Sequence, residues 1–183
     1  MSERAEEVRR ALADLFRDES SKITRIAWRL VGGNNALARD VIQDACVRCL
    51  ERAGQLRELD ALSGWFYRTL VNCAHTRHQR HYALAKAKAI FSNQPPMPTL
   101  PTDLPDHGLQ RRIRDALWDL RRSQREAFVL VRLERLSVGE SAAIMNISEQ
   151  ALRNHLHRGE QALKVALKDL RGQHHGGRDD TSD

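Results

Sequence analysis

Residues 137–163 read SVGESAAIMNISEQALRNHLHRGEQAL and contain two helix-start signals separated by a short turn. Ser137-Val-Gly-Glu140 has the Ser-x-x-Glu pattern, in which the two side chains satisfy free backbone donors of a first helical turn. Ser148 supplies a second N-cap. Asn146 stands between the two predicted helices, and asparagine tolerates the left-handed conformation that such a turn requires. A short helix, a tight turn and a second capped helix predict a helix-turn-helix.

The second helix of this motif carries side chains that can hydrogen-bond to base edges or phosphates in a major groove. Its start and exposed face comprise Ser148, Gln150, Arg153, Asn154, His157 and Arg158. The plainer alternative is a structural three-helix bundle whose polar face is only solvated. Capped helix spacing and donor-rich residues coincide here, and this coincidence favours a DNA-reading helix.

Two further helices are predicted before the motif. Ser123-Gln-Arg-Glu126 repeats the Ser-x-x-Glu pattern and predicts a helix start at Ser123. Apolar residues at 113, 117 and 120 recur at helical spacing and predict a helix ahead of it. The predicted helices from there on cover about 123–133, 137–145 and 148–170.

A proline-rich segment divides the chain into two parts. All five prolines of the chain lie between Pro95 and Pro105, where they stop helix continuation and favour an extended connector. Both flanking parts show helical periodicity with almost no strand patterning, so we predict an all-α fold of two small helical domains. The predicted divisions are a first domain over 1–92, a flexible linker over 93–108, a second domain over 109–172 and a disordered polar tail over 173–183.

The first domain begins with one or two amphipathic helices that end at the turn signal Gly32-Gly-Asn-Asn35. Apolar residues between Leu37 and Leu50 predict a next helix, whose opposite, polar face is free to bind a partner. A polar loop over about 55–62 follows, and Ser63 is the predicted cap of a long third helix.

The third helix is strongly basic. Its segment from Trp65 to Lys88 has no Asp or Glu, and its Arg and Lys residues alternate with histidines beside aromatic side chains. Such a helix suits phosphate neutralisation combined with stacking against unpaired bases. A basic face that is only solvated would look similar. The chain nevertheless has two separate candidate DNA-contact regions, joined by a linker, and few classes of DNA-binding protein have this arrangement.

The composition argues against a membrane protein and against a secreted, disulfide-rich protein. Lys and Arg outnumber Asp and Glu by 30 to 24, which favours a polyanionic partner. The charged start of the chain and the lack of a long apolar run predict no export signal and no membrane insertion. The three cysteines are few, and their number is odd, so they do not indicate a disulfide framework. Reduced thiols are typical of a reducing compartment, so a cytoplasmic location is expected.

No catalytic or metal site is expected. Cys46 and Cys49 have a spacing seen at zinc and redox sites, but they fall on the apolar stripe of a predicted helix and are interpreted as buried thiols. The ladder of His75, His78 and His81 is interleaved with arginines, which favours a nucleic-acid face over a metal site. No nucleophile and base stand together, so the chain is predicted to be no enzyme and to need no cofactor.

Three segments in this order resemble the extracytoplasmic-function group of sigma-70-type sigma factors, the small promoter-recognition subunits of bacterial RNA polymerase. Residues 38–53, ARDVIQDACVRCLERA, are similar to the group's helix that binds the clamp of core RNA polymerase. Residues 64–81, GWFYRTLVNCAHTRHQRH, are similar to the segment that opens and reads the minus-10 element. Residues 120–163 look like the region that reads the minus-35 element as duplex DNA.

The resemblance implies a role for each matching residue. Core-polymerase binding is implied for Asp40, Gln43, Asp44 and Arg48. Minus-10 binding is implied for Trp65, Arg68, Asn72, Arg77 and Arg80, with the loop over 55–63 as the candidate for base specificity. Minus-35 binding falls to the exposed face of the helix-turn-helix.

The resemblance also implies partners, namely core RNA polymerase, promoter DNA that is duplex at minus-35 and melted at minus-10, and an anti-sigma factor that holds the chain inactive. The predicted function is that of an alternative sigma factor. Two alternatives are a sigma mimic that sequesters an anti-sigma factor and a stand-alone helix-turn-helix regulator. The helix over 40–48 and the Trp65 segment argue against the regulator, and the basic faces argue against the mimic.

Overall fold

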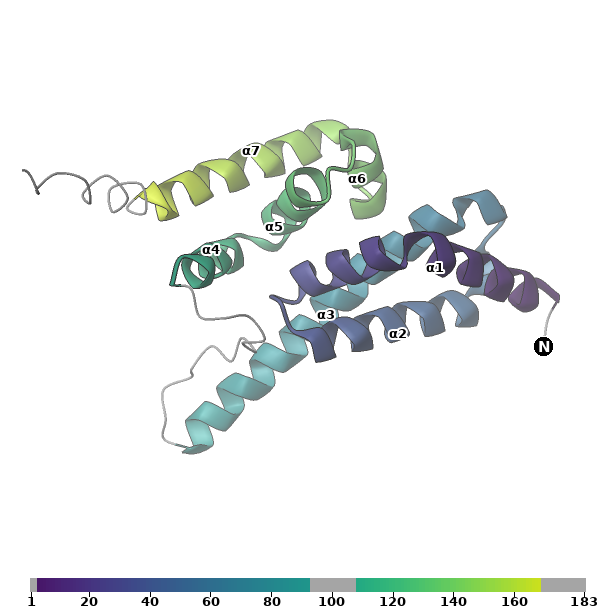
Figure 1. The fold of residues 1–183 in the computed structure, drawn as a ribbon, viewed down its shortest axis with the longest axis horizontal. Helices are drawn as coiled ribbons and strands as arrows, with labels where there is room; N and C mark the ends of the chain where they lie inside the picture. Colours follow the sequence, from purple (N-terminus) through teal and green to yellow (C-terminus); the bar gives the residue numbers. More distant parts are fainter. Residues whose placement is uncertain (1–2, 93–107, 169–183) are drawn as a thin grey trace, which may run out of the picture.

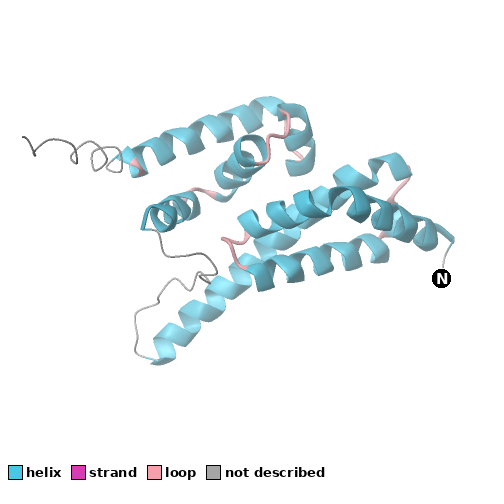
Figure 2. Ribbon diagram, viewed as in Figure 1, coloured by secondary structure: helices cyan, strands magenta, loops and turns pink. Residues whose placement is uncertain are grey.

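The computed structural model describes residues 3–92 and 108–168. Within these ranges every element of regular structure is a helix, and turns join the helices (Figure 2). The predicted all-α fold is therefore confirmed. Most of the predicted linker over 93–108, and the predicted tail over 173–183, lie outside the described residues.

The first lobe is built from three long helices, α1 (Glu3–Leu30), α2 (Asn35–Glu51) and α3 (Leu62–Ser92). Each runs back along the previous one, and the C-terminal half of α3 extends beyond the other two (Figure 1). Gly32 and Gly33 turn the chain between α1 and α2 with positive φ angles of 74° and 87°. Only a residue without a Cβ adopts such angles readily, which explains why the GGNN signal ends the first helix.

The core of this lobe lies between the three helices. Phe66 on α3 is fully buried and packs edge-on against Phe16 and Tyr67, at ring-centroid distances of 5.5 and 5.9 Å. The apolar stripe of α2 contributes Val41, Ala45 and Cys49, among others. The other fully buried large side chains of the lobe are Val8, Ile23, Ile26, Val31, Leu70 and Cys73.

The second lobe consists of α4 (Gly108–Asp119), α5 (Arg122–Phe128), a π-helical turn η3 (Val129–Leu133), α6 (Val138–Met145) and α7 (Glu149–Ala166). Its own core contains small residues that allow close packing. Gly159 of α7 is one of them, because a Cβ there would come within 3.3 Å of Gln124 on α5. Buried apolar residues of the lobe include Ala116, Leu120, Ala127, Ala142, Leu152, Leu156 and Leu163.

The helix-turn-helix forms as its start signals predict. The Ser137 hydroxyl accepts a hydrogen bond from the Glu140 N–H at 3.1 Å, and the Ser137 N–H donates to the Glu140 carboxylate at 2.8 Å. The Ser148 hydroxyl caps α7 by accepting from the Ala151 N–H at 3.2 Å. Asn146 ends α6 in the left-handed region, with φ 56° and ψ 47°.

Two other helices begin close to the predicted positions, but the serines predicted to cap them do not. α5 begins at Arg122 rather than at Ser123, because the Gln124 side chain accepts from the Arg121 N–H at 3.3 Å. Glu126, the expected partner of Ser123, is buried and accepts from Arg122 instead. α3 begins at Leu62, directly after a 3-10 turn, so Ser63 lies inside the first helical turn.

Asn146 offers a direct test of the turn. Replacing it with valine should lower the free energy of unfolding by about 1–2 kcal/mol, because a β-branched residue is strained at positive φ. Asn146→Gly should leave the stability unchanged or slightly higher, since glycine carries no such penalty. Urea unfolding followed by circular dichroism would measure both. An equal loss in both variants would mean that the asparagine side chain itself, and not the backbone angle, supports the turn.

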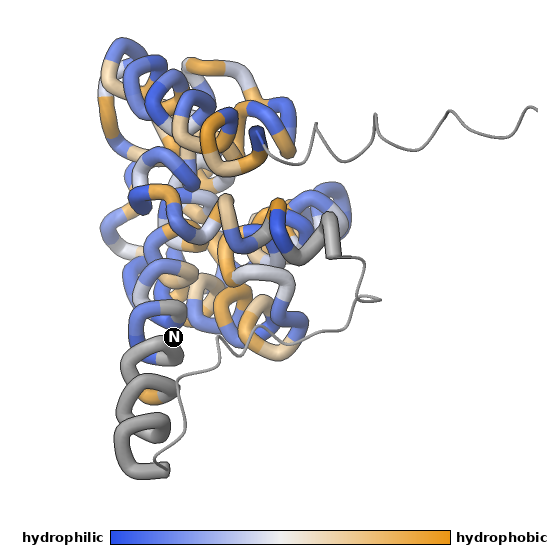
Figure 3. The backbone as a smooth tube through the Cα atoms, turned by 90° about the vertical axis from the view of Figure 1, so that its left-hand side faces the viewer, coloured by the Kyte–Doolittle hydropathy of each residue, from blue (hydrophilic) through white to orange (hydrophobic). Residues whose placement is uncertain are grey.

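The two lobes pack against each other. Val129 and Leu130 of η3 and Ile144 of α6 are buried in the same apolar cluster as the core of the first lobe. Figure 1 shows α5 and α6 lying over α1 and α3, and the view from the side in Figure 3 shows the second lobe stacked on the first. No helix among the described residues is long and apolar enough to cross a membrane.

Candidate nucleic-acid interface

The predicted DNA-reading side chains of the helix-turn-helix lie on an exposed surface, here called the α7 face, which comprises Ser148, Gln150, Arg153, Asn154, His157 and Arg158. All six residues are exposed. Ser148 occupies the N-cap, so its hydroxyl is already engaged within the helix. Arg153 donates to Glu149 one turn earlier at 2.7 Å, in an ion pair that is half-exposed on both sides. Such a pair is weak in water and exchanges easily for a phosphate or a guanine.

The predicted minus-10 residues lie along one helix and form the α3 face, defined as Trp65, Arg68, Asn72, Arg77 and Arg80. Trp65 is half-buried and packs against the core of the first lobe. Asn72 and Arg80 are exposed, and Arg68 and Arg77 are half-buried. Arg68, Asn72 and Arg77 each contact side chains or backbone from other helices, so only part of this face is free of protein contacts.

The second lobe covers the middle of the α3 face. Arg68 donates to the backbone carbonyl of Ala143 on α6 at 2.8 Å, and its Nε is buried with no partner among the described residues. Arg122 of α5 donates to the Asn72 side-chain oxygen at 3.2 Å. Both contacts join residues 50 or more positions apart in the sequence. Asn72 is nevertheless exposed and Arg68 half-buried, so DNA that binds these two side chains must compete with the contacts to the second lobe.

The predicted polymerase-binding residues form the α2 face, defined as Asp40, Gln43, Asp44 and Arg48. Gln43 is exposed and the other three are half-buried. The neighbouring apolar residues Val47 and Leu50 are 46% and 36% exposed, although the sequence pattern places Leu50 in the core. An exposed face that combines charges with apolar side chains suits a protein partner better than a nucleic acid.

Arg77 joins the α3 face to the α2 face. Its Nε and Nη2 donate to the two carboxylate oxygens of Asp44 at 2.6 and 2.9 Å, and Nη1 reaches Asp40 at 3.4 Å. The hydrogen bonds from Arg77 hold the pKa of Asp44 below its usual range. Sequence reasoning assigns these residues to different partners, whereas the structure brings them into one ion-paired cluster.

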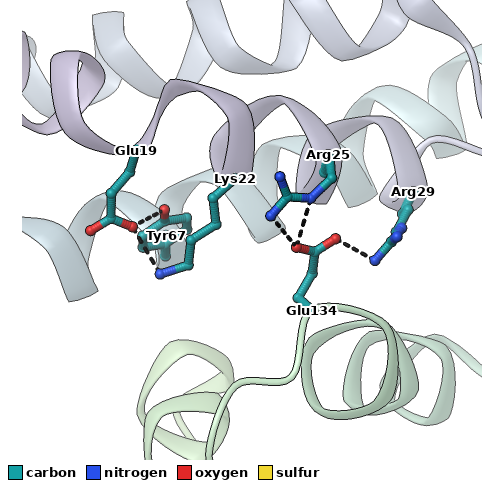
Figure 4. A network of polar contacts seen from close by, with 6 residues as sticks. All are labelled: Glu19, Lys22, Arg25, Arg29, Tyr67 and Glu134. Carbon is teal, nitrogen blue, oxygen red and sulfur yellow. Dashed lines mark hydrogen bonds and ion pairs between the residues drawn. The ribbon is translucent and has the colours of Figure 1, made fainter.

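A second ion-paired cluster, which was not predicted from the sequence, lies between the lobes. Glu134, directly after η3, accepts hydrogen bonds from Arg25 and Arg29 of α1 (Figure 4). Next to it, Glu19 accepts from Tyr67 of α3 at 2.6 Å and from Lys22 at 2.8 Å. Local sequence carries no signal for the Glu134 contacts, because the partners lie 109 and 105 positions away.

The loop between α2 and α3, the candidate for minus-10 specificity, is exposed over most of its length. Two 3-10 turns shape it, Ala53–Gln55 and Leu59–Ala61. Arg4 of α1 fixes the loop by donating to the carbonyls of Leu56 and Arg57, each at 2.7 Å. The backbone is therefore held while the side chains at the tip remain open to solvent.

The cysteines are packed as apolar residues. Cys49 and Cys73 are buried and Cys46 is half-buried. Burial raises the pKa of all three thiols, and that of Cys49 rises to about 11. The interpretation of this pair as packed thiols therefore holds for Cys49 and in part for Cys46. His75 is half-buried, and desolvation lowers its pKa, whereas the side chains of His78 and His81 lie outside the described part of the structure.

Two sequence families match separate parts of the chain. The family described as Sigma-70 region 2 matches residues 15–83, and the family described as Sigma-70, region 4 matches residues 110–163. The first match covers most of α1, all of α2 and most of α3. The second runs from α4 into α7 and includes the whole α7 face.

Curated proteins match over nearly the whole length. The chain is 32% identical over 165 residues to the RNA polymerase sigma factor CarQ of Myxococcus xanthus, a match that covers 87% of this chain and 91% of that protein. It is 26% identical over 170 residues to the ECF RNA polymerase sigma factor SigW of Bacillus subtilis, covering 87% and 90%.

Solved structures share the fold. CnrH, solved in complex with the cytosolic domain of CnrY, superposes with a TM-score of 0.64 at 19% identity and covers 91% of this chain and 96% of its own. RpoE of Bartonella quintana, solved in complex with the anti-sigma factor NepR, gives a TM-score of 0.62 at 18% identity, with coverage of 86% and 96%.

Proposed function

This chain belongs to the extracytoplasmic-function group of sigma-70-type RNA polymerase sigma factors, and from that premise we propose how its three faces divide the work of starting transcription. The α7 face reads duplex DNA at the minus-35 element. The α3 face, with the loop before it, captures melted DNA at minus-10. The α2 face binds core RNA polymerase, which supplies the chemistry in the cytoplasm.

The proposed role of the α7 face rests on exposure and donor chemistry. Arg153, Asn154 and Arg158 project from a capped helix, and arginine and asparagine are the side chains that read guanine and adenine in the major groove. The N-terminus of α7 adds unpaired backbone donors for a phosphate. These features support duplex recognition by this helix.

The proposed role of the α3 face rests on its chemistry. A base taken out of the stack needs a surface to lie on and donors to hold its edge. Trp65 and Arg80 supply these, and Arg68 and Asn72 would join them once the second lobe moves away. The exposed loop side chains at the start of α3 are the proposed source of base preference.

Arg77 has a different proposed role from the one that sequence reasoning gives it. Its guanidinium already satisfies both oxygens of Asp44, so it serves as a positioning residue that orients the carboxylates of the α2 face for polymerase. A bidentate arginine–carboxylate pair fixes direction as well as charge. This pairing supports polymerase recognition by the α2 face rather than DNA contact by Arg77.

We also propose that an anti-sigma factor holds the chain inactive. The solved neighbour RpoE is bound to such a protein, and the two lobes of this chain present adjoining surfaces that one partner could cover. An open apolar cavity of about 390 Å³ lies between the lobes, with Trp28, Leu117 and Trp118 in its lining. A cavity of that size is within the range of binding pockets.

The experiment that tests the function is transcription with bacterial core RNA polymerase and purified protein on a library of upstream DNA fragments. Specific starts that share two spaced sequence elements are expected. If no transcript starts appear and the protein does not co-migrate with core polymerase, the proposal is contradicted and a sigma mimic is favoured. Binding of duplex operators by the protein alone would favour an ordinary helix-turn-helix regulator.

A further inference from the structure

We propose that Glu134 is a latch that holds the second lobe against the α3 face, so that Arg68 and Asn72 of the free protein stay bonded to that lobe until a partner parts the lobes. The proposal rests on the proposed function, because it takes the α3 face to be the minus-10 surface. Beyond that function, it assigns a role to the ion pairs that Arg25 and Arg29 of α1 form with Glu134 of the second lobe.

The carboxylate of Glu134 is shielded and held from two sides. Its side chain is only 1% exposed, and one oxygen accepts from both Nε and Nη2 of Arg25 at 3.3 Å. The other oxygen accepts from Arg29. A buried carboxylate with two guanidinium donors is well satisfied, whereas the same carboxylate left buried without them would be strongly unfavourable. Parting the lobes returns the carboxylate to water, so the two guanidinium groups are what offsets its desolvation in the packed arrangement, and a positive charge at this position would be strongly unfavourable there.

The backbone structure around Glu134 places its side chain against α1. The α5 helix widens into the π-helical turn η3, and the Glu134 N–H bonds to the Val129 carbonyl five residues earlier at 2.9 Å. Arg135 follows with φ 56°, a left-handed angle that is uncommon outside glycine. π-turns and strained residues cluster at functional positions. Here the two together turn the chain immediately beside the side chain that meets α1 (Figure 4).

On the first lobe, the receiving surface is held in place independently of the second lobe. Glu19 on α1 accepts from Tyr67 of α3 and from Lys22, which fixes α1 against α3 one or two turns before Arg25. Figure 4 shows Glu19 and Lys22 of α1 beside Tyr67 of α3, and Arg25 and Arg29 further along α1 directed at Glu134. The two arginines therefore present a preformed positive site.

The latch acts together with other contacts between the second lobe and the first. Ile144, Val129 and Leu130 enter the apolar cluster of the first lobe, and Arg68 and Asn72 of the α3 face are bonded to α6 and α5. The α7 face lies outside this interface and stays exposed. Closure thus engages two polar side chains of one DNA surface, where DNA must compete for them, and leaves the other DNA surface free.

Closure lowers the apparent affinity for melted DNA by the fraction of molecules that are open. Glu134→Arg places a third positive charge beside Arg25 and Arg29 and should open the lobes. We expect a larger radius of gyration in small-angle X-ray scattering. We also expect at least roughly ten-fold tighter binding of a short fluorescent single-stranded DNA of mixed sequence, measured without polymerase.

Matched variants separate the latch from general effects of charge and folding. Glu160→Arg is the control, because it changes the net charge by the same amount as Glu134→Arg but removes a pair within the second lobe, that of Glu160 with Arg132 at 2.5 Å, and it should change neither measurement. Arg25→Glu/Arg29→Glu breaks the latch from the first lobe, where the side chains are partly exposed, and should open the protein as Glu134→Arg does. Combining all three substitutions swaps the charges and should restore closure.

Two results would overturn the inference. One is a Glu134→Arg protein of native helical content whose radius of gyration and DNA binding equal those of the unmodified chain. The other is a charge-swapped triple variant as open as Glu134→Arg, which would show that the ion pairs do not hold the lobes. Neither assay contains polymerase, so opening of Glu134→Arg in a chain that directs no transcript starts would uphold the latch and reject the proposed function.

Discussion

Arg153→Glu/Arg158→Glu should lose minus-35 binding by about 100-fold or more while it still binds core polymerase. Each good bidentate contact in the major groove is worth about 1–3 kcal/mol of discrimination, and reversal of charge adds repulsion from the phosphates. Both side chains are exposed, so the fold should be unaffected. Once the transcription experiment has given a promoter, fluorescence anisotropy on its duplex minus-35 element would measure the loss.

The matched control for this variant is Arg10→Glu/Arg17→Glu. These arginines are exposed on α1, 79% and 70% at the side chain, and the double change alters the net charge by the same amount. It should weaken duplex binding only slightly, through the general electrostatic field. An equal loss in both double variants would show that total charge, and not the α7 face, governs DNA binding. An equal loss of polymerase affinity in Arg153→Glu/Arg158→Glu would refute the division of labour between the lobes.

Asp44→Ala should weaken binding to core polymerase by about 2–5 kcal/mol, the range seen when one member of a hydrogen-bonded charge cluster is removed at an interface. The loss has two sources, the missing carboxylate and the loss of both short hydrogen bonds of Arg77, which keeps only its 3.4 Å contact with Asp40. Arg77→Met should weaken polymerase binding in the same direction but less, because Asp44 remains and only its orientation is lost. Titration of labelled core polymerase would measure both.

Asp14→Ala is the control for Asp44→Ala, since Asp14 forms a comparable but more exposed ion pair with Arg17 on α1. It should leave polymerase affinity unchanged. Binding of Arg77→Met holoenzyme to melted promoter DNA separates the two roles of that arginine. A loss confined to DNA binding, with polymerase affinity intact, would return Arg77 to the DNA-contact role that the sequence pattern assigns to it.

The sequence predicts those parts of the structure that depend on neighbouring residues. Caps at Ser137 and Ser148 and the left-handed Asn146 follow from side chains and backbone groups within three residues of one another. The prediction at Ser123 fails for a non-local reason. Glu126 is buried beside Arg122, and Gln124 meets the helix start instead, so the same four-letter pattern has another outcome.

The sequence predicts which residues belong to the candidate site, but it does not predict which of them contact one another. The α7 face is exposed on one capped helix, as its spacing indicates. The pairing of Arg77 with Asp44 spans 33 positions and joins two helices. The sequence pattern of each helix gives no sign of the other. Glu134 is harder still, because its role depends on how two lobes pack after both have folded. A pattern with a period of one helical turn carries no information about such contacts.

The buried thiols decide which chemical signals this factor can register directly. Only the thiolate attacks peroxides and disulfides, and a raised pKa keeps that form scarce at neutral pH. Cys49 and Cys73 are in addition shut off from reagents by the packing of the first lobe. We therefore expect the three thiols to react slowly with oxidants, so that a redox signal would reach this factor through a reactive group on another molecule.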